Sequence, residues 1–412
     1  MPLASADENG RRRAVLKKRM TALLFAVLLA LLLAGCRRKE EQQPSSPAPE
    51  PTAQATAVPT EESRIVEPQE IESEEEIIPE GMVKSYLTGE YVKEEIGSRR
   101  PVAFMMSNSR DAVPQSGIAN AGVIYEAPVE GGITRLMAIM EDYDQLEKIG
   151  SMRSCRDYFI FYAAGFDAIY THYGQSAYAL PILELPQVDN ISGLADYTDY
   201  VFYRTKDRKS PHNAYTSFEG IQKGIEICGY SQEYEEGYEG AYTFAKVGET
   251  VELPGNWKAQ IVKIGYEYNQ PWFEYHQEDG LYYRYQYAEP QIDEETGEQL
   301  TCRNILIQFS SWRFYDKNGY LNIDVDEPGE GIYITNGQAI PVTWKKHTPW
   351  GPTYYYDSNG NEITLNTGKT WVCIVQDTYR EQTAVTDSDG FTPPMGQNQI
   401  AISAAEAADT EY

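Results

Sequence analysis

The chain has 412 residues, with 35 Lys and Arg against 62 Asp and Glu, and a formal net charge of −27. This acidic excess argues against a protein that binds nucleic acid, because phosphate backbones require a concentrated Lys and Arg surface. Hydrophobic residues make up 42% of the chain and charged residues 24%, which are ordinary values for globular proteins. The length therefore predicts two or three domains.

The N-terminus has the organisation of an export signal. Six basic residues between Arg11 and Arg19 precede an apolar run from Met20 to Ala34 that is short for a membrane span. The run ends in Leu-Ala-Gly-Cys36, which resembles the lipobox of bacterial lipoproteins. The resemblance implies that residues 1–35 are a cleaved signal peptide and that Cys36 is lipidated. We expect a lipid anchor that holds the protein on the extracytoplasmic face of the cytoplasmic membrane, with an uncleaved anchor helix as the alternative.

Two segments have the composition of disordered chain. Residues 36–90 are rich in Pro, Ser, Ala, Thr, Gln and Glu, and residues 381–412 are similarly polar. Such segments bury too little apolar surface to offset the entropy lost on ordering. We expect the first to be an acidic, Pro-rich tether and the second to be a disordered tail.

Residues 91–230 alternate short apolar runs with helical patterns, which predicts a mixed α/β N-terminal domain. The expected strands are 102–106, 123–125, 136–140 and 168–170, and the expected helices are 155–166, 177–184 and 218–228. Ser154 and Ser217 precede two of these helices, and a Ser side chain at that position accepts a hydrogen bond from an otherwise unpaired backbone N–H. Both are therefore predicted N-caps.

Residues 231–249 form a predicted connection to a β-rich C-terminal domain at 250–380. Strands are expected at 282–287, 304–309, 331–335, 353–356 and 371–375. The pairs Asn336-Gly337 and Asn359-Gly360 are hairpin turn signals. The expected fold class is thus α+β, with the α/β domain first and the β-rich domain second.

Basic residues cluster in the first domain in a way that predicts an anion-binding site. Arginines beside the start of a helix suit a phosphate or a carboxylate. Their positive charge adds to the backbone N–H groups that point outward from the first turn of the helix. The candidate anion-binding residues are Arg135, Arg153, Ser154, Arg156, Arg208 and His212, and the run that supplies the last two begins at Arg204. Asp157 and Glu126 are candidates for orienting a ligand or holding a metal. The alternative is that the arginines form structural ion pairs with Glu126, Asp157 and Asp207.

Other chemistry is weakly indicated. The chain has four His residues, none in a close ligand pair, so no cofactor is expected and a divalent metal is not indicated. Ser116 fits a turn better than a nucleophile. Cys155, Cys228, Cys302 and Cys373 belong to an exported chain, in which disulfides are permitted. Cys302 and Cys373 are the pair that lies in two predicted strands of one domain, and their pairing stays open.

Several uncommon strings occur in an order that resembles the YerB-like lipoprotein family of Gram-positive bacteria. They are Pro101–Asn108, Pro114–Gly117, Tyr125–Arg135, Arg153–Asp157, Asp167–His172 and Arg208–Asn213, followed by Gly337, Pro341–Lys346, the turn at Asp357 and Gly368–Trp371. The resemblance covers nearly all of the predicted folded part. It implies two domains and an envelope lipoprotein of unknown function. The chain departs from the usual pattern at Ser107, Ser109, Val113 and Cys155, which puts in doubt a mechanism that needs the usual His and Arg.

A looser similarity connects the order of these motifs, including a Gly-x-Ser, with the LytR-CpsA-Psr phosphotransferases, in which arginines hold a polyprenyl pyrophosphate. It implies an enzyme acting on a phosphorylated or polyprenyl-pyrophosphate-linked substrate, with arginines stabilising phosphoryl charge and Asp157 holding a metal or the acceptor. The other function class is a binding lipoprotein that recognises an anionic cell-wall polymer, a lipid-linked precursor or an envelope protein. No complete catalytic set can be named, so binding is favoured.

Overall fold

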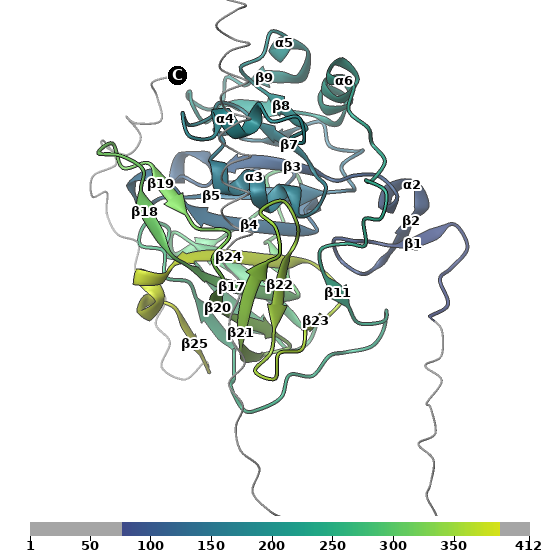
Figure 1. The fold of residues 1–412 in the computed structure, drawn as a ribbon, viewed down its shortest axis with the longest axis vertical. Coiled ribbons are helices and arrows are strands. Elements are labelled where there is room, and N and C mark those ends of the chain that lie inside the picture. Colours follow the sequence, from purple (N-terminus) through teal and green to yellow (C-terminus); the bar gives the residue numbers. More distant parts are fainter. Residues whose placement is uncertain (1–75, 388–412) are drawn as a thin grey trace, which may run out of the picture. The chain divides into compact units, whose positions relative to one another are not determined.

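The computed structural model describes residues 76–387, so the predicted signal peptide, Cys36 and the greater part of the tether and tail lie outside the described residues. The main sheet has ten strands that come from both predicted domains (Figure 1). Their bounds are β3 Val102–Ser107, β4 Val123–Pro128, β5 Thr134–Met140, β7 Ile169–His172, β8 Asn190–Ser192, β17 Asn304–Ser310, β20 Gly329–Thr335, β21 Gln338–Lys346, β22 Thr353–Tyr356 and β24 Thr370–Gln376. The order across the sheet is β22-β21-β20-β17-β24-β4-β5-β3-β7-β8.

The join between the two halves of this sheet is a parallel pair. β24 lies between β17 and β4 and is parallel to both, with Thr370 opposite Val123 in the register. The N-terminal strands and the C-terminal strands therefore share one continuous hydrogen-bonded sheet.

A second sheet of six strands belongs to the C-terminal part. Its members are β12 Ile261–Lys263, β13 Trp272–His276, β14 Leu281–Gln286, β15 Glu289–Pro290, β16 Thr301–Cys302 and β25 Ala384–Thr386. The order is β15-β14-β13-β12-β25, and β16 also pairs with β14. β25 lies in the stretch that composition assigned to the tail, and its pairing with β12 extends the ordered chain beyond residue 380.

The remaining strands form small sheets. They are β1 Met82–Lys84 with β2 Tyr91–Lys93, β6 Ile149–Gly150 and β9 Phe202–Arg204 with β10 Ala214–Thr216, β11 Thr243–Phe244 with β23 Thr364–Leu365, and β18 Trp312–Phe314 with β19 Leu321–Ile323. β1 lies within the stretch assigned to the tether. Order begins this early because the Glu76 carboxylate accepts hydrogen bonds from Lys84, Tyr91 and the Val247 backbone N–H, at 2.8 to 3.0 Å.

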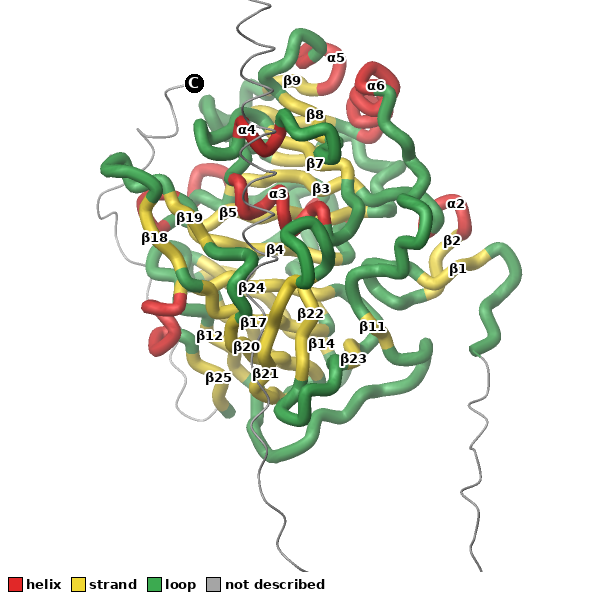
Figure 2. Tube along the Cα trace, in the orientation of Figure 1, coloured by secondary structure: helices red, strands yellow, loops and turns green. Residues whose placement is uncertain are grey.

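The helices are short and come mainly from the N-terminal part, as the distribution of red in Figure 2 shows. They are α2 Glu94–Gly97, α3 Asp157–Ala164, α4 Leu180–Leu183, α5 Thr198–Val201 and α6 Phe218–Cys228, with 3-10 turns η1 Arg110–Ala112, η2 Ile118–Asn120, η3 Glu130–Gly132 and η4 Asp377–Gln382. None of the helices between residues 76 and 387 has the length and apolar character needed to cross a membrane.

Side chains alternate between the two faces of the main sheet, and both faces are buried. Along β3, Phe104 packs on the side of α6 and the six-stranded sheet, whereas Met105 packs on the side of α3. β24 alternates in the same way, with Trp371 on the first side and Val372 on the second. The α+β class with a β-rich C-terminal part is thereby confirmed.

One prediction about the details of this fold is wrong. Ser217 does cap α6, since its Oγ accepts from the Gly220 N–H at 3.1 Å, but Ser154 is not an N-cap. α3 begins at Asp157 because the backbone before it is extended: the Arg153 N–H donates to the Met105 carbonyl of β3. The pairing of Cys302 with Cys373, which the sequence left open, does not occur: both thiols are free, as are those of Cys155 and Cys228.

Candidate functional site

Part of the predicted basic cluster lines one small cavity of about 140 Å³. Arg153, Ser154 and Arg156 precede α3, and Arg204 ends β9. The remaining lining residues are Met152, Tyr173, Gly174, Gln175, Ser176, Leu194, Ser210, Pro211 and Tyr320. We call this space the arginine cavity. Among the described residues that line it there is no carboxylate.

Backbone pairing fixes the floor of the arginine cavity. Arg153 is extended between two neighbours: its N–H donates to the Met105 carbonyl at 2.9 Å, and its carbonyl accepts from the Tyr173 N–H at 3.0 Å. Gly174 has φ of +93°, and a Cβ at that position would lie 2.7 Å from the Ser154 Oγ. Only glycine therefore lets the 173–176 turn approach Ser154 this closely. This turn contains the Gly-x-Ser motif noted in the sequence.

Arg156 is held by a partner that the sequence reading did not select. Its guanidinium forms a bidentate ion pair with Glu130, with Nε 3.0 and 2.8 Å from the two carboxylate oxygens, and both residues are buried. The structural ion-pair interpretation therefore holds for Arg156, with Glu130 in place of Glu126 or Asp157. Glu130 immediately precedes the Gly131-Gly132 pair of the basic motif, and this proximity in sequence is the one feature that could have suggested Glu130 as a partner.

Arg135 and Arg204 lie behind and beside the cavity. Arg135 is buried in β5, and its Nη1 donates to the Ser154 carbonyl, so it supports the chain segment that carries the lining residues. Arg204 is exposed, lies with its guanidinium 4.7 Å from the centre of the Tyr173 ring, and donates to the Asn213 Oδ1 at 2.7 Å. The positive groups at the cavity thus come from three separate segments.

The other predicted site residues lie elsewhere. Arg208 donates to the carbonyls of Ala112 and Pro114 at 2.5 and 2.6 Å and lies 3.4 Å from the Glu294 carboxylate. The Nδ1 of His212 lies 3.2 Å from the Ser109 Oγ, and neither residue lines the arginine cavity.

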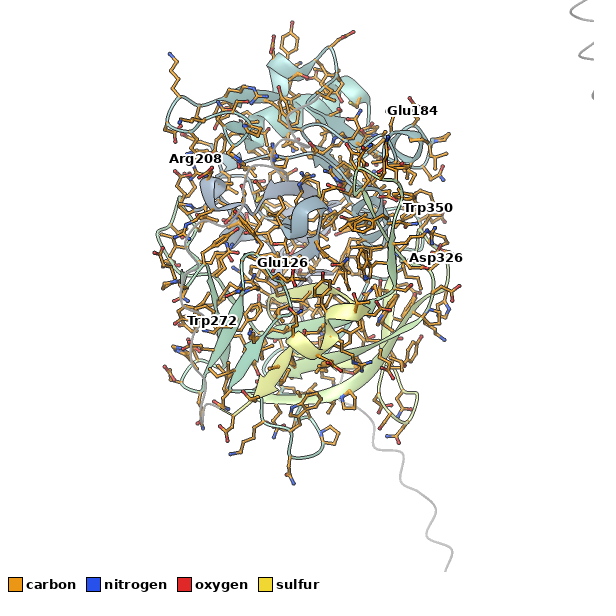
Figure 3. The ribbon with its side chains drawn as sticks, turned by 90° about the vertical axis from the view of Figure 1, so that its left-hand side faces the viewer. Glu126, Glu184, Arg208, Trp272, Asp326 and Trp350 are labelled. Atoms are coloured by element: carbon orange, nitrogen blue, oxygen red, sulfur yellow. The ribbon has the colours of Figure 1, made fainter. Side chains whose placement is uncertain are left out.

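The two predicted carboxylates face the protein interior. The Asp157 Oδ2 accepts from the Tyr315 hydroxyl, and burial raises the pKa of this carboxyl above its usual value. Glu126 has no exposed surface and lies near the middle of the molecule in Figure 3, where its carboxylate accepts from Arg284. No group of three or more His, Cys, Asp or Glu that could hold a metal occurs within residues 76–387.

Tyr320 had no signal in the sequence, and the Gly-x-Ser motif did not indicate that Gln175 and Ser176 would lie beside the arginines. Tyr320 comes from the C-terminal part, and its ring centre lies 5.8 Å from the Arg156 guanidinium. Gln175 and Ser176 follow β7 in the chain and lie beside Cys155, whose carbonyl accepts from the Ser176 N–H. Their proximity to the arginines depends on how β7 pairs in the sheet, which sequence spacing does not reveal.

Comparison with known proteins agrees with this architecture. Residues 87–231 match the N-terminal domain, and residues 262–372 the C-terminal domain, of the family described as "Protein of unknown function (DUF3048)". The chain is 32% identical over 299 residues to "Putative lipoprotein YerB" of Bacillus subtilis (strain 168), covering 72% of this chain and 87% of that protein. It is also similar to the crystal structure of YerB from Bacillus subtilis, with a TM-score of 0.66, 30% identity, and coverage of 74% of this chain and 100% of that one. The chain therefore belongs to the DUF3048 family of YerB-like lipoproteins, as its sequence motifs predicted.

Proposed function

We propose that this protein is a lipid-anchored binding protein of the cell envelope that holds an anionic group of an envelope component in the arginine cavity. The observation that carries the proposal is the convergence of Arg153, Arg156 and Arg204 on one cavity whose lining contains no carboxylate among the described residues. Arg156 is ion-paired with Glu130, so its own charge toward a ligand is partly neutralised.

The size of the cavity supports a single anionic group. A volume of about 140 Å³ corresponds to roughly five water molecules at about 30 Å³ each. One phosphate or carboxylate group has a comparable number of heavy atoms, and the rest of the ligand would extend outward. Arginine suits this role because its planar guanidinium donates two parallel hydrogen bonds to such oxygens.

The N-terminal sequence, and the similarity to a protein named as a putative lipoprotein, support a place of action at the cell membrane. Lipidation at Cys36 would anchor the protein to the extracytoplasmic face of the membrane, where cell-wall polymers and lipid-linked precursors expose phosphates and carboxylates. These are the ligands that the proposal favours.

The alternative is an enzyme that acts on a phosphorylated or polyprenyl-pyrophosphate-linked substrate. Phosphoryl transfer needs a group that orients the acceptor or holds a metal beside the phosphate. Asp157 was the candidate for that role, but it accepts from Tyr315 and does not line the arginine cavity. The binding proposal needs no such group, so the geometry favours it.

The experiment compares arginines inside and outside the cavity. Inorganic phosphate, pyrophosphate and sn-glycerol 3-phosphate would be titrated by calorimetry into the unsubstituted protein and into Arg153→Ala and Arg204→Ala. We expect both variants to lose most of the binding, and added salt to weaken binding by the unsubstituted protein. Arg380→Ala is the matched control, because this half-exposed arginine pairs with Glu330 away from the cavity.

Equal binding by all four proteins would refute the assignment of the arginine cavity. Melting temperatures of the same proteins identify a variant that loses binding merely because it is unfolded. Arg204→Ala is the safer variant in this respect, since Arg204 is exposed.

A further inference from the structure

A second and larger cavity, of about 460 Å³, lies where the N-terminal part, the connection and the C-terminal part meet. Its walls are the end of α3, residues 235–238 and the loop Trp350–Pro352 between β21 and β22. Figure 3 labels Trp350 on the side of the molecule opposite Arg208. We call this space the Trp350 cleft, and it shares no lining residue with the arginine cavity.

The wall that carries Trp350 is closely packed against the N-terminal part. A Cβ on Gly165, just after α3, would lie 3.0 Å from the Gly351 carbonyl oxygen, so the loop sits directly against the helix end. The Trp350 ring is partly exposed and lies 4.8 Å from the Phe161 ring, centre to centre. The indole is therefore held in place while part of it faces the cleft.

The floor of the Trp350 cleft is a buried ion-paired group. Arg100 is 9% exposed, and its guanidinium lies 3.2 Å from the Asp167 carboxylate and 2.7 Å from that of Asp189. It also donates to the Ser231 carbonyl at 3.0 Å. The N–H groups of Arg100 are directed to these acceptors, so this arginine holds the floor of the cleft together. Its single positive charge is smaller than the total negative charge of the carboxylates that line the cleft.

Two features of the Trp350 cleft favour a positively charged ligand. Its lining contains four carboxylates, those of Asp167, Asp189, Glu235 and Glu236, against the single guanidinium of Arg100. The Trp350 ring offers the aromatic face that attracts ammonium groups most strongly.

We propose that the Trp350 cleft binds an alkylammonium group carried by an envelope component. The ammonium lies against the Trp350 face and between the Glu235 and Glu236 carboxylates, and the remaining volume accepts the chain or ring that bears it. A lysine side chain of a peptide and the amino group of an amino sugar share this chemistry. This activity is independent of anion binding in the arginine cavity.

The test uses ligand pairs that differ in charge. Nα-acetyl-lysine amide would be compared with its Nε-acetylated form, and glucosamine with N-acetylglucosamine, by ligand-observed NMR with the full-length protein. We expect at least one amine to bind and its acetylated partner to bind much more weakly. Binding of the lysine compound alone would identify a peptide source, and binding of glucosamine alone would identify an amino sugar.

Variants place the binding in the cleft. The double variant Glu235→Gln with Glu236→Gln should weaken amine binding roughly tenfold without affecting folding, since both residues are exposed. Trp350→Leu should weaken it about tenfold as well, because an apolar residue remains but the aromatic face is lost. Glu278→Gln is the control, because its side chain is 75% exposed and does not line the cleft.

The proposal is overturned if neither amine binds, if the acetylated ligands bind equally well, or if the Glu235 and Glu236 double variant binds like the control. Phosphate titration of the same variants should match the unsubstituted protein, which separates this site from the arginine cavity.

Discussion

The ion pair between Glu126 and Arg284 gives the sharpest test of how this fold is held together. Both side chains have no exposed surface, and the Arg284 Nη2 contacts the Glu126 Oε2 at 2.5 Å. The other carboxylate oxygen accepts from Asn108, Thr134 and Asn269, at 2.8 to 3.2 Å. Breaking a buried pair by removing one partner typically costs about 3–5 kcal/mol of unfolding free energy, because the remaining charge is left buried.

The two single variants should differ in a defined direction. Glu126→Gln leaves Arg284 charged, because a guanidinium cannot release its proton in a protein. Contacts at 4.7 and 4.5 Å with the rings of Phe273 and Trp371 offset only part of that loss. Arg284→Met leaves the Glu126 carboxylate with the hydrogen bonds from its three neutral donors. We therefore expect Glu126→Gln to lose about 4–5 kcal/mol and Arg284→Met about 3 kcal/mol.

Urea unfolding followed by Trp fluorescence measures these losses, and the double variant completes the cycle. Each single variant leaves one buried charge without its partner, and the double variant leaves neither charge. The double variant should therefore lose less unfolding free energy than the two single variants added together, with a coupling energy of about 1–3 kcal/mol. Additive losses, or a milder effect of Glu126→Gln than of Arg284→Met, would refute the reasoning. Phosphate binding under native conditions should be unchanged in both, since neither residue lines the arginine cavity.

Three further predictions concern titration and anchoring. Burial raises the pKa of Glu141 to about 7. As pH rises from 4.5 to 7, Glu141 ionises in the unfolded state before it ionises in the folded state, so the folded protein loses up to about 3 kcal/mol of stability. Glu141→Gln should remove this loss, and urea unfolding at pH 4 and at pH 8 measures it. Burial lowers the pKa of Lys346, whose ammonium donates to the Phe161 carbonyl at 2.7 Å, to about 7. Stability should therefore rise between pH 7 and 10.5, and unfolding curves of Lys346→Met should lack that rise. Cys36→Ala should abolish incorporation of labelled fatty acid and release the protein from the membrane fraction, and unchanged labelling would contradict lipidation.

Local features of the fold were predictable wherever one short segment contains its own signal. α6 lies at the residues expected, because Ser217 caps its start and Gly229, with φ of +71°, ends it. Asn336 and Gly337 both have positive φ and form the two-residue turn between β20 and β21, as their sequence indicated. In these cases the information is local, so the sequence alone was sufficient.

Features that depend on distant segments were not predictable from spacing. Ser154 resembles an N-cap in sequence, but pairing of Arg153 with β3 keeps this stretch extended and moves the start of α3 to Asp157. The sequence indicated the basic cluster but not its ion-pair partners. Arg156 pairs with Glu130 and Arg208 with Glu294 because the fold brings these distant residues together. Likewise, nothing in the sequence placed β24 beside β4, because parallel neighbours carry no turn signal between them.

The position of β24 has a consequence for how the chain acquires its structure. β4 and β24 are separated by roughly 250 residues, and contacts so distant in sequence form slowly because a long loop must close first. A chain synthesised from its N-terminus therefore presents the unpaired edge of β4 until nearly all of the described residues have been made, and such an edge invites pairing with other chains. Completion of the main sheet is thus a late event, during which a chaperone for exposed strand edges would be most useful.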